Sequence, residues 1–278
     1  MKLVVNNTNR REKITSDLYH EGPPIRKNFN EAVQVLIWIV FTTVSLTGYG
    51  QDATEIVRMA DEKFRGESSR GVTTMIIERP SWSREISMKN WSLGDEYSMI
   101  YITAPAKEKG QVFLKRKSEM WNWVPTIERM IKIPPSMMMQ SWMGSDFTND
   151  DLVRESSIVK DYDQVLTGEE TLRDYECHKI ELTPHPEASV VWGKIIMWIS
   201  KNEYHWLKAE FYDEDGELVN TEILSEIKLM DDREMPTRME MIPADKKGHK
   251  TILIFDEIEF NVDLDESFFS QQNMRRIR

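Results

Sequence analysis

Cysteine is nearly absent from the sequence, since Cys177 is the only one among 278 residues. One thiol cannot form a disulfide within the chain, so the fold must be held by its core. Basic residues are also few, with 36 Lys and Arg against 47 Asp and Glu and a formal net charge of -11. Because this surplus of negative charge repels a polyphosphate backbone, we expect no nucleic-acid partner.

The common catalytic and metal-binding motifs are missing as well. No two of the five histidines are separated by the three residues that place both on adjacent turns of one helix face, and neither a G-x-S-x-G elbow nor a phosphate-binding G-x-x-x-x-G-K-[ST] loop occurs. We therefore expect no enzymatic activity, no cofactor and no metal site. A hydrolase stays open as a minor alternative, with His178, His185, His205 or His249 joined to partners from distant parts of the chain.

Long apolar runs are scarce. The strongly apolar part of the first fifty residues, from Val33 to Leu46, has 14 residues, fewer than the roughly 20 that a helix needs to span a bilayer. Arg26 and Lys27 precede this run, and small glycines end the segment at residue 50. Such a basic flank, short apolar run and small-residue end are typical of a signal peptide.

Residues 1–50 are therefore predicted to be a cleaved signal peptide with an extended polar n-region, and residues 51–278 a single exported domain. An uncleaved N-terminal anchor is the alternative. No cysteine follows the apolar run, which excludes lipid attachment at a mature N-terminal cysteine. Contact of the exported domain with a membrane is expected to be peripheral or transient.

The exported part begins with a helical pattern and continues with strands. Residues Asp52–Phe64 place apolar side chains on one helical stripe behind an Asp N-cap. Apolar and polar residues then alternate in many short segments, with turns about every ten residues, such as Lys201–Glu203. Because no later helix is long enough for a crossover, this pattern predicts a mostly β (α+β) domain with an antiparallel meander. Cys177 is expected to be a buried strand residue.

The segment from Ser136 to Leu152 follows neither pattern. It combines several methionines with Trp142 and Phe147 behind two prolines, and methionine suits irregular apolar space that changes shape. We interpret it as a mobile lid of short helix and loop. The alternative is that these side chains plug one end of the core.

Large aromatic residues are the most distinctive feature of the exported part. Aromatic side chains on both faces of a strand, as in Trp198 and its neighbours, indicate that the sheet is covered on both faces or encloses a volume. An apolar volume of this kind is able to hold an acyl chain. The residues predicted to line or gate it are Trp121, Trp123, Met138, Trp142, Met143 and Phe147. Arg129 is expected to meet a lipid headgroup or to pin the lid to an acidic residue such as Asp146.

Several blocks of sequence resemble a known family. They are MWNWVPTIERMIKI (Met120–Ile133), SWMGSDFTNDDL (Ser141–Leu152), PTRMEM (Pro236–Met241) and the C-terminal block from Phe255 to Arg276. Together they look like the outer membrane lipoprotein-sorting protein family, the LolA-like group. The resemblance covers essentially the whole exported part, and the first two blocks are its most specific portions.

This resemblance implies an unclosed antiparallel β-barrel, a half-barrel of about ten or eleven strands with an N-terminal helix and a cavity that accepts lipid. It also implies a periplasmic carrier of lipid or lipoprotein acyl chains that works with an RND-type exporter, without catalysis. The alternative is a sensing or scaffold module for envelope stress that uses the same fold to bind a protein. The family's own cavity residues have no counterparts in this chain that the motifs identify.

Overall fold

The computed structural model describes residues 52–153, 157–188 and 190–278. The signal-peptide prediction for residues 1–50 lies outside this described part of the chain. Among the described residues, no helix has both the length and the apolar character needed to cross a membrane.

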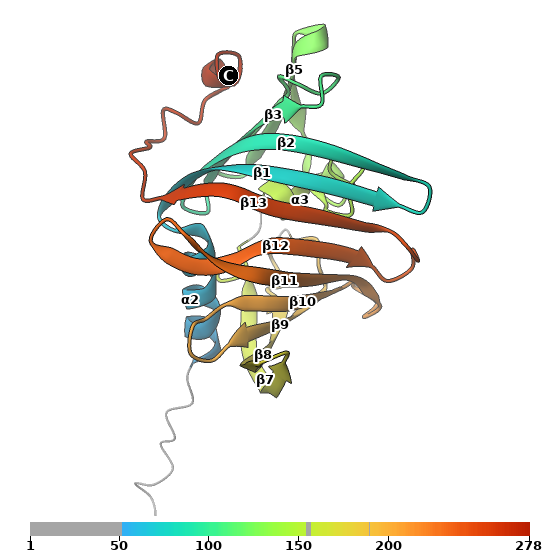
Figure 1. The fold of residues 1–278 in the computed structure, drawn as a ribbon, viewed down its shortest axis with the longest axis vertical. Helices are drawn as coiled ribbons and strands as arrows, with labels where there is room; N and C mark the ends of the chain where they lie inside the picture. The colour runs from blue at the N-terminus through green and yellow to red at the C-terminus, as the bar shows by residue number, and fades with distance from the viewer. Residues whose placement is uncertain (1–51, 154–156, 189) are drawn as a thin grey trace, which may run out of the picture. The chain divides into compact units, whose positions relative to one another are not determined.

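One antiparallel sheet dominates the structure (Figure 1). Its strands are β1 (Ser68–Arg79), β2 (Trp82–Leu93), β3 (Tyr97–Ala104), β4 (Val112–Arg116), β5 (Glu119–Val124), β6 (Arg129–Ile133), β7 (Tyr162–Leu172), β8 (Tyr175–Pro184), β9 (Lys194–Ser200), β10 (Trp206–Tyr212), β11 (Leu218–Met230), β12 (Arg233–Pro243) and β13 (Lys250–Phe260). They lie in the order β6-β5-β4-β3-β2-β1-β13-β12-β11-β10-β9-β8-β7. Because β6 and β7 are the two edges, the sheet is an unclosed half-barrel, as predicted.

The described residues form thirteen strands, so the expected ten or eleven was too low. The difference includes the block at residues 119–133, in which Pro125 interrupts the alternation of apolar and polar residues. The structure shows a hairpin there, with β5 and β6 joined by the short 3-10 helix η2 (Pro125–Ile127) and by Glu128 in the left-handed region. Proline is favoured at the start of such a turn.

The α2 helix (Ala53–Arg65) has 13 residues, and the remaining helices of the described chain are short. They are the 3-10 helix η3 (Pro135–Met137), α3 (Asn149–Val153) and α4 (Gln271–Met274). The predicted Asp52 cap is confirmed, because its side chain accepts a hydrogen bond from the Thr54 N–H at 3.1 Å. The α2 helix buries Ile56, Val57 and Ala60 in the core on the concave side of the sheet (Figure 1).

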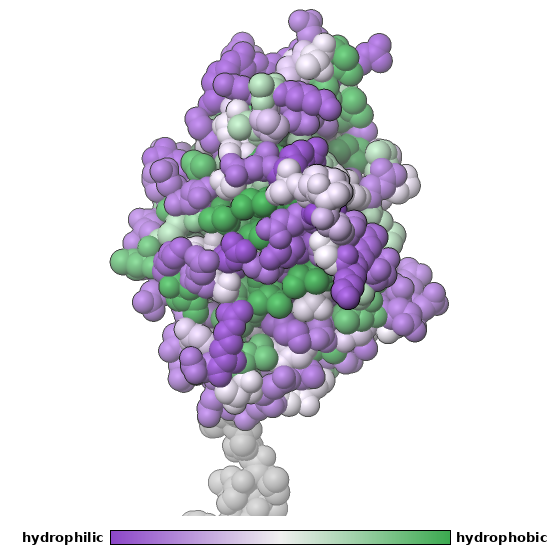
Figure 2. Space-filling view, turned by 45° about the vertical axis from the view of Figure 1, so that its right-hand side comes forward, coloured by the Kyte–Doolittle hydropathy of each residue, from purple (hydrophilic) through white to green (hydrophobic). Residues whose placement is uncertain are grey.

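The alternation along each strand sorts side chains between two faces. In β9, Ile195, Met197 and Ile199 belong to the main core, whereas Trp198 belongs to a small cluster on the other face with Cys177 and Leu207. Cys177 is fully buried, as predicted. Figure 2 shows apolar side chains in short patches between hydrophilic ones, which is the pattern of a sheet with one face toward water.

The C-terminal tail, residues 261–278, covers the convex face of β3 and β4. Phe269 and Met274 are buried there with Tyr97, Met99 and other strand residues. Arg116 fastens the tail by donating to the Phe269 carbonyl at 2.9 Å. The tail is therefore the layer that excludes water from this part of the sheet.

The described residues between β6 and β7, 134–153 and 157–161, contribute side chains to the core. Trp142 is fully buried against the Phe113 ring, with ring centroids 5.0 Å apart, and Phe147 is 2% exposed. Only part of the segment faces water, including Met139. Within the described residues this arrangement matches the alternative that these side chains plug the core.

Candidate functional site

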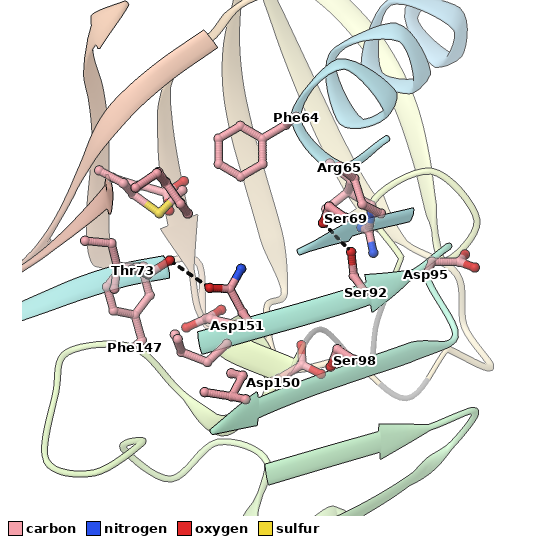
Figure 3. A pocket seen from close by; sticks show the side chains of 18 of the residues that line it. Phe64, Arg65, Ser69, Thr73, Ser92, Asp95, Ser98, Phe147, Asp150 and Asp151 are labelled. Carbon is pink, nitrogen blue, oxygen red and sulfur yellow. Dashed lines mark hydrogen bonds between the residues drawn. The ribbon is translucent and has the colours of Figure 1, made fainter. Parts of the chain in front are cut away.

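A cavity of about 220 Å³ lies between α2, the concave face of the sheet and the start of α3. It is the space that the core leaves unfilled. Its apolar wall includes Phe64, Phe147, Trp192, Trp206, Phe211 and Phe255. Figure 3 shows Phe64 reaching into it from α2, opposite Phe147.

Aromatic side chains hold the apolar wall in place. Phe64 contacts Phe255 edge to face with ring centroids 5.3 Å apart, and lies 6.4 Å from Trp206. Trp192 packs on Phe211 at 5.2 Å. Such offset and edge contacts keep large rings in fixed positions, so the cavity keeps its shape without a ligand.

A polar strip on β1, β2 and β3 faces the same space. Ser69 and Ser92 share a hydrogen bond of 2.7 Å, and Thr73 donates to the Asn90 side-chain oxygen at 3.0 Å (Figure 3). Ser98 extends the strip, and its buried hydroxyl has no hydrogen-bond partner among the described residues. The cavity is therefore amphipathic.

Carboxylates complete the polar end. Asp151 accepts hydrogen bonds from the Trp192 indole at 3.0 Å and from the Thr148 N–H at 2.8 Å, while the Thr148 hydroxyl accepts from the Asp151 N–H. This reciprocal pair caps α3. Burial raises the pKa of Asp151 to about 6, although these hydrogen bonds act in the opposite direction.

The predicted cavity residues occupy different places. Phe147 lines the cavity. Met138 and Trp142 are buried in the adjoining core, and Met143 packs against it. Trp121 and Trp123 lie elsewhere, since both pack in the cluster beneath the C-terminal tail.

The expected pairing of Arg129 with Asp146 is wrong. Asp146 pairs instead with Arg79 at 2.8 Å, and both side chains are less than a tenth exposed. The Thr251 hydroxyl also donates to Asp146 at 2.7 Å. Arg129 starts the edge strand β6 and is exposed. Asp146 thus fastens the 134–161 segment to the end of β1, which carries Arg79.

The polar strip was missed in the sequence, although a signal for it exists. Alternate positions of β1 and β2 are polar at one end and apolar at the other, as in the step from Ser69 and Thr73 to Met75 and Ile77. If one whole face of a strand packed in an apolar core, every alternate residue on that face would be apolar.

Chemistry at the cavity has little support among the described residues. No histidine lies among its lining residues, and no group of three or more His, Cys, Asp and Glu side chains is placed to hold a metal. Burial lowers the pKa of His205 to about 4 and also lowers the pKa of His178, because it disfavours the charged form of each imidazole.

Solved structures with this architecture are known. A DUF1329 family protein from Desulfovibrio piger ATCC 29098 has a TM-score of 0.72 at 24% identity, covering 80% of this chain and 97% of that one. A LolA superfamily protein from Nitrosomonas europaea has a TM-score of 0.70 at 25% identity, covering 80% and 99%. A domain from Vibrio parahaemolyticus, provisionally assigned to an outer membrane lipoprotein-sorting protein, has a TM-score of 0.72 at 23% identity, covering 81% and 98%.

These similarities define the class of the protein by its fold, an open half-barrel of the LolA-like type. A family model with the description "-like: Uncharacterized protein" matches residues 94–276, more than half of the chain. The chain belongs to the family that this model describes. No protein with a curated description matches its sequence.

Proposed function

We propose that the protein is an exported periplasmic carrier that binds acyl chains of lipids or lipoproteins, without catalysis. The observation that carries this proposal is the amphipathic cavity of about 220 Å³ inside the half-barrel. A dry apolar cavity of about 150 Å³ is large enough for benzene, so the space here accommodates a larger hydrophobic group. Burial of eight methylenes supplies about 6 kcal/mol at about 0.8 kcal/mol each.

The similarity to LolA superfamily and lipoprotein-sorting structures supports the same proposal. Within it, Phe147 lines the cargo site, and Met138, Trp142 and Met143 support the wall beside it. Arg129 is exposed on the edge strand β6, so in this proposal it would meet a headgroup outside the cavity.

Binding is tested with the neutral fluorescent probe N-phenyl-1-naphthylamine and by native mass spectrometry of protein exposed to membrane lipids. Ile258 lines the cavity and is half-buried, so Ile258→Trp fills space that an acyl chain needs. We expect this substitution to weaken probe binding about tenfold or more, the equivalent of 1.4 kcal/mol.

Ile227→Trp is the matched control. Ile227 is also half-buried and also in the sheet, but it packs against the Cys177 cluster on the other face. Unchanged probe binding in Ile227→Trp, with loss in Ile258→Trp, supports the cavity as the site. A clean protein mass after lipid exposure, together with no probe uptake by the unsubstituted protein, contradicts the carrier proposal.

Cooperation with an RND-type exporter is a further part of the proposal. It is tested by affinity purification of the tagged, exported protein from intact cells after cross-linking. Recovery of an exporter's periplasmic domain supports the partnership, whereas recovery of a sigma-factor regulator instead supports the sensing alternative.

A further inference from the structure

Acidic side chains outnumber basic ones among the residues that line the cavity. Its carboxylate residues are Asp95, Asp150, Asp151 and Glu222, whereas Arg65 is the one cationic residue among the described residues that line it. The Arg65 guanidinium already pairs with Asp61 at 3.0 Å. The buried Arg65 Nε has no hydrogen-bond partner among the described residues, but this single guanidinium stands against four acidic side chains, so acidic groups predominate in the lining.

Two of these acidic residues are well withdrawn from water. Asp150 is 3% exposed and Glu222 is 4% exposed. Charges at such positions interact more strongly than at the surface, because solvent screens them less. An anionic headgroup that entered beside them would meet repulsion and lose its hydration.

Asp95 differs, because it lies at the turn after β2 and pairs with Lys160 at 2.6 Å. The Lys160 side chain is mostly exposed and does not line the cavity. The Lys160 ammonium group therefore lies at the rim and adds no positive charge to the lining.

The polar strip offers hydrogen bonds without charge. Figure 3 shows Ser69, Ser92 and Asp95 toward the end of the cavity that also holds Arg65, and draws Ser98 nearer to Asp150. The Ser98 hydroxyl, buried and without a partner among the described residues, is available to a ligand. Hydroxyl groups on a ligand would find both acceptors and donors there, and a hydrogen bond to a carboxylate is stronger than one between neutral groups.

From this arrangement we infer that the cavity selects amphiphiles whose polar end carries no negative charge and donates hydrogen bonds, and that it discriminates against free fatty-acid anions. The inference rests on the proposed function and specifies its class of ligand. The apolar wall holds the chain, and the serine strip with Asp150, Asp151 and Glu222 holds the polar end.

The test compares three ligands with the same twelve-carbon chain at pH 8: 1-monododecanoylglycerol, dodecylamine and dodecanoate. Each displaces N-phenyl-1-naphthylamine from the full exported domain. We expect dodecanoate to bind at least about tenfold more weakly than the monoacylglycerol, a difference of about 1.4 kcal/mol. Dodecylamine distinguishes a requirement for neutrality from tolerance of a cation, and binding comparable to that of the monoacylglycerol is the expected result.

Glu222→Gln and Asp151→Asn each remove one carboxylate with little change of shape. Either substitution is expected to strengthen dodecanoate binding about threefold or more, because one repulsive charge is lost. The control is Asp163→Asn, since Asp163 is 78% exposed on β7 and outside the cavity. It is expected to leave all three affinities unchanged.

The outcomes separate this inference from the carrier proposal. Equal affinity for dodecanoate and the monoacylglycerol overturns the charge selectivity while the carrier function stands. Binding of none of the three ligands, and none of the probe, overturns both. Because the comparison of headgroups uses the unsubstituted protein, it decides the question even if a substituted variant fails to fold.

Discussion

The two faces of the sheet use large apolar side chains in opposite ways. On the convex face of β3 and β4, the chain's own C-terminal tail supplies Phe269 and Met274, and the cluster is filled. On the concave face, Phe64 contacts both Trp206 and Phe255, yet these rings leave a cavity. Aromatic content alone therefore says little about binding, since what distinguishes the faces is whether another segment of the chain completes the packing.

The largest expected effect comes from the buried ion pair that fastens the concave side. Asp146→Ala removes the carboxylate that lies 2.8 Å from the Arg79 guanidinium. Both side chains are less than a tenth exposed. Loss of one partner of a buried pair is expected to lower the free energy of unfolding by about 3 to 4 kcal/mol. Urea denaturation measures this change.

Glu259→Ala is the matched control, because it breaks the Arg70–Glu259 pair, in which both side chains are 56% exposed. An exposed pair contributes less than about 1 kcal/mol. Equal effects of the two substitutions would show that the 134–161 segment is not fastened to the sheet through Asp146.

The second prediction concerns the filled face. Phe269→Ala removes a fully buried ring from beneath the tail and is expected to lower the free energy of unfolding by about 3 kcal/mol. Because Phe269 does not line the cavity, the affinity for the fluorescent probe should not change in the folded protein. A large loss of probe affinity would indicate that the two faces are coupled.

The third prediction concerns pH on the cavity side. Burial raises the pKa of Asp151 from 3.8 to about 6, so between these values the folded state holds a proton that the unfolded state has released. The free energy of unfolding therefore falls as pH rises from 4 to 6, by about 2 kcal/mol for this group.

Other carboxylates contribute slopes of their own, so the informative quantity is the difference between the unsubstituted protein and Asp151→Asn. This difference, from urea denaturation at pH 4 and pH 7, should change by about 2 kcal/mol in favour of the variant at the higher pH. A difference that stays constant with pH contradicts the raised pKa.

The smallest expected effect is at the cavity rim. Phe64→Ala removes a half-buried ring beside a space that is already empty, so we expect a loss of about 1 kcal/mol, mainly from its contacts with Phe255 and Trp206. Thermal and urea denaturation beside Phe269→Ala test the ranking. A loss as large as that of Phe269→Ala would mean that the concave face is packed as tightly as the convex one.

Local sequence signals were sufficient for much of the fold. The Asp52 cap and the apolar stripe predicted α2, and the turn at Lys201–Glu203 predicted the hairpin of β9 and β10. These features depend on residues close together in the chain. The antiparallel arrangement followed from the short turns and from the resemblance to a known family.

The site was less accessible to sequence reasoning, because it depends on register. Between Val72 and Thr73 the pairing of β1 with β13 shifts by one residue. As a result, Phe255 and Ile258 both line the cavity although strict alternation would separate them. Similarly, the alternation of residues around Trp121 indicates a strand, but it does not show which face of that strand the C-terminal tail covers.

The strands at the two open edges, β6 and β7, follow one another directly along the chain. The connection between them therefore joins the two edges of the half-barrel, and none of its described residues belongs to a strand of the sheet. Insertions or deletions there would resize the interior while every strand keeps its neighbours. The volume of the cavity can thus change while the order of the strands stays the same.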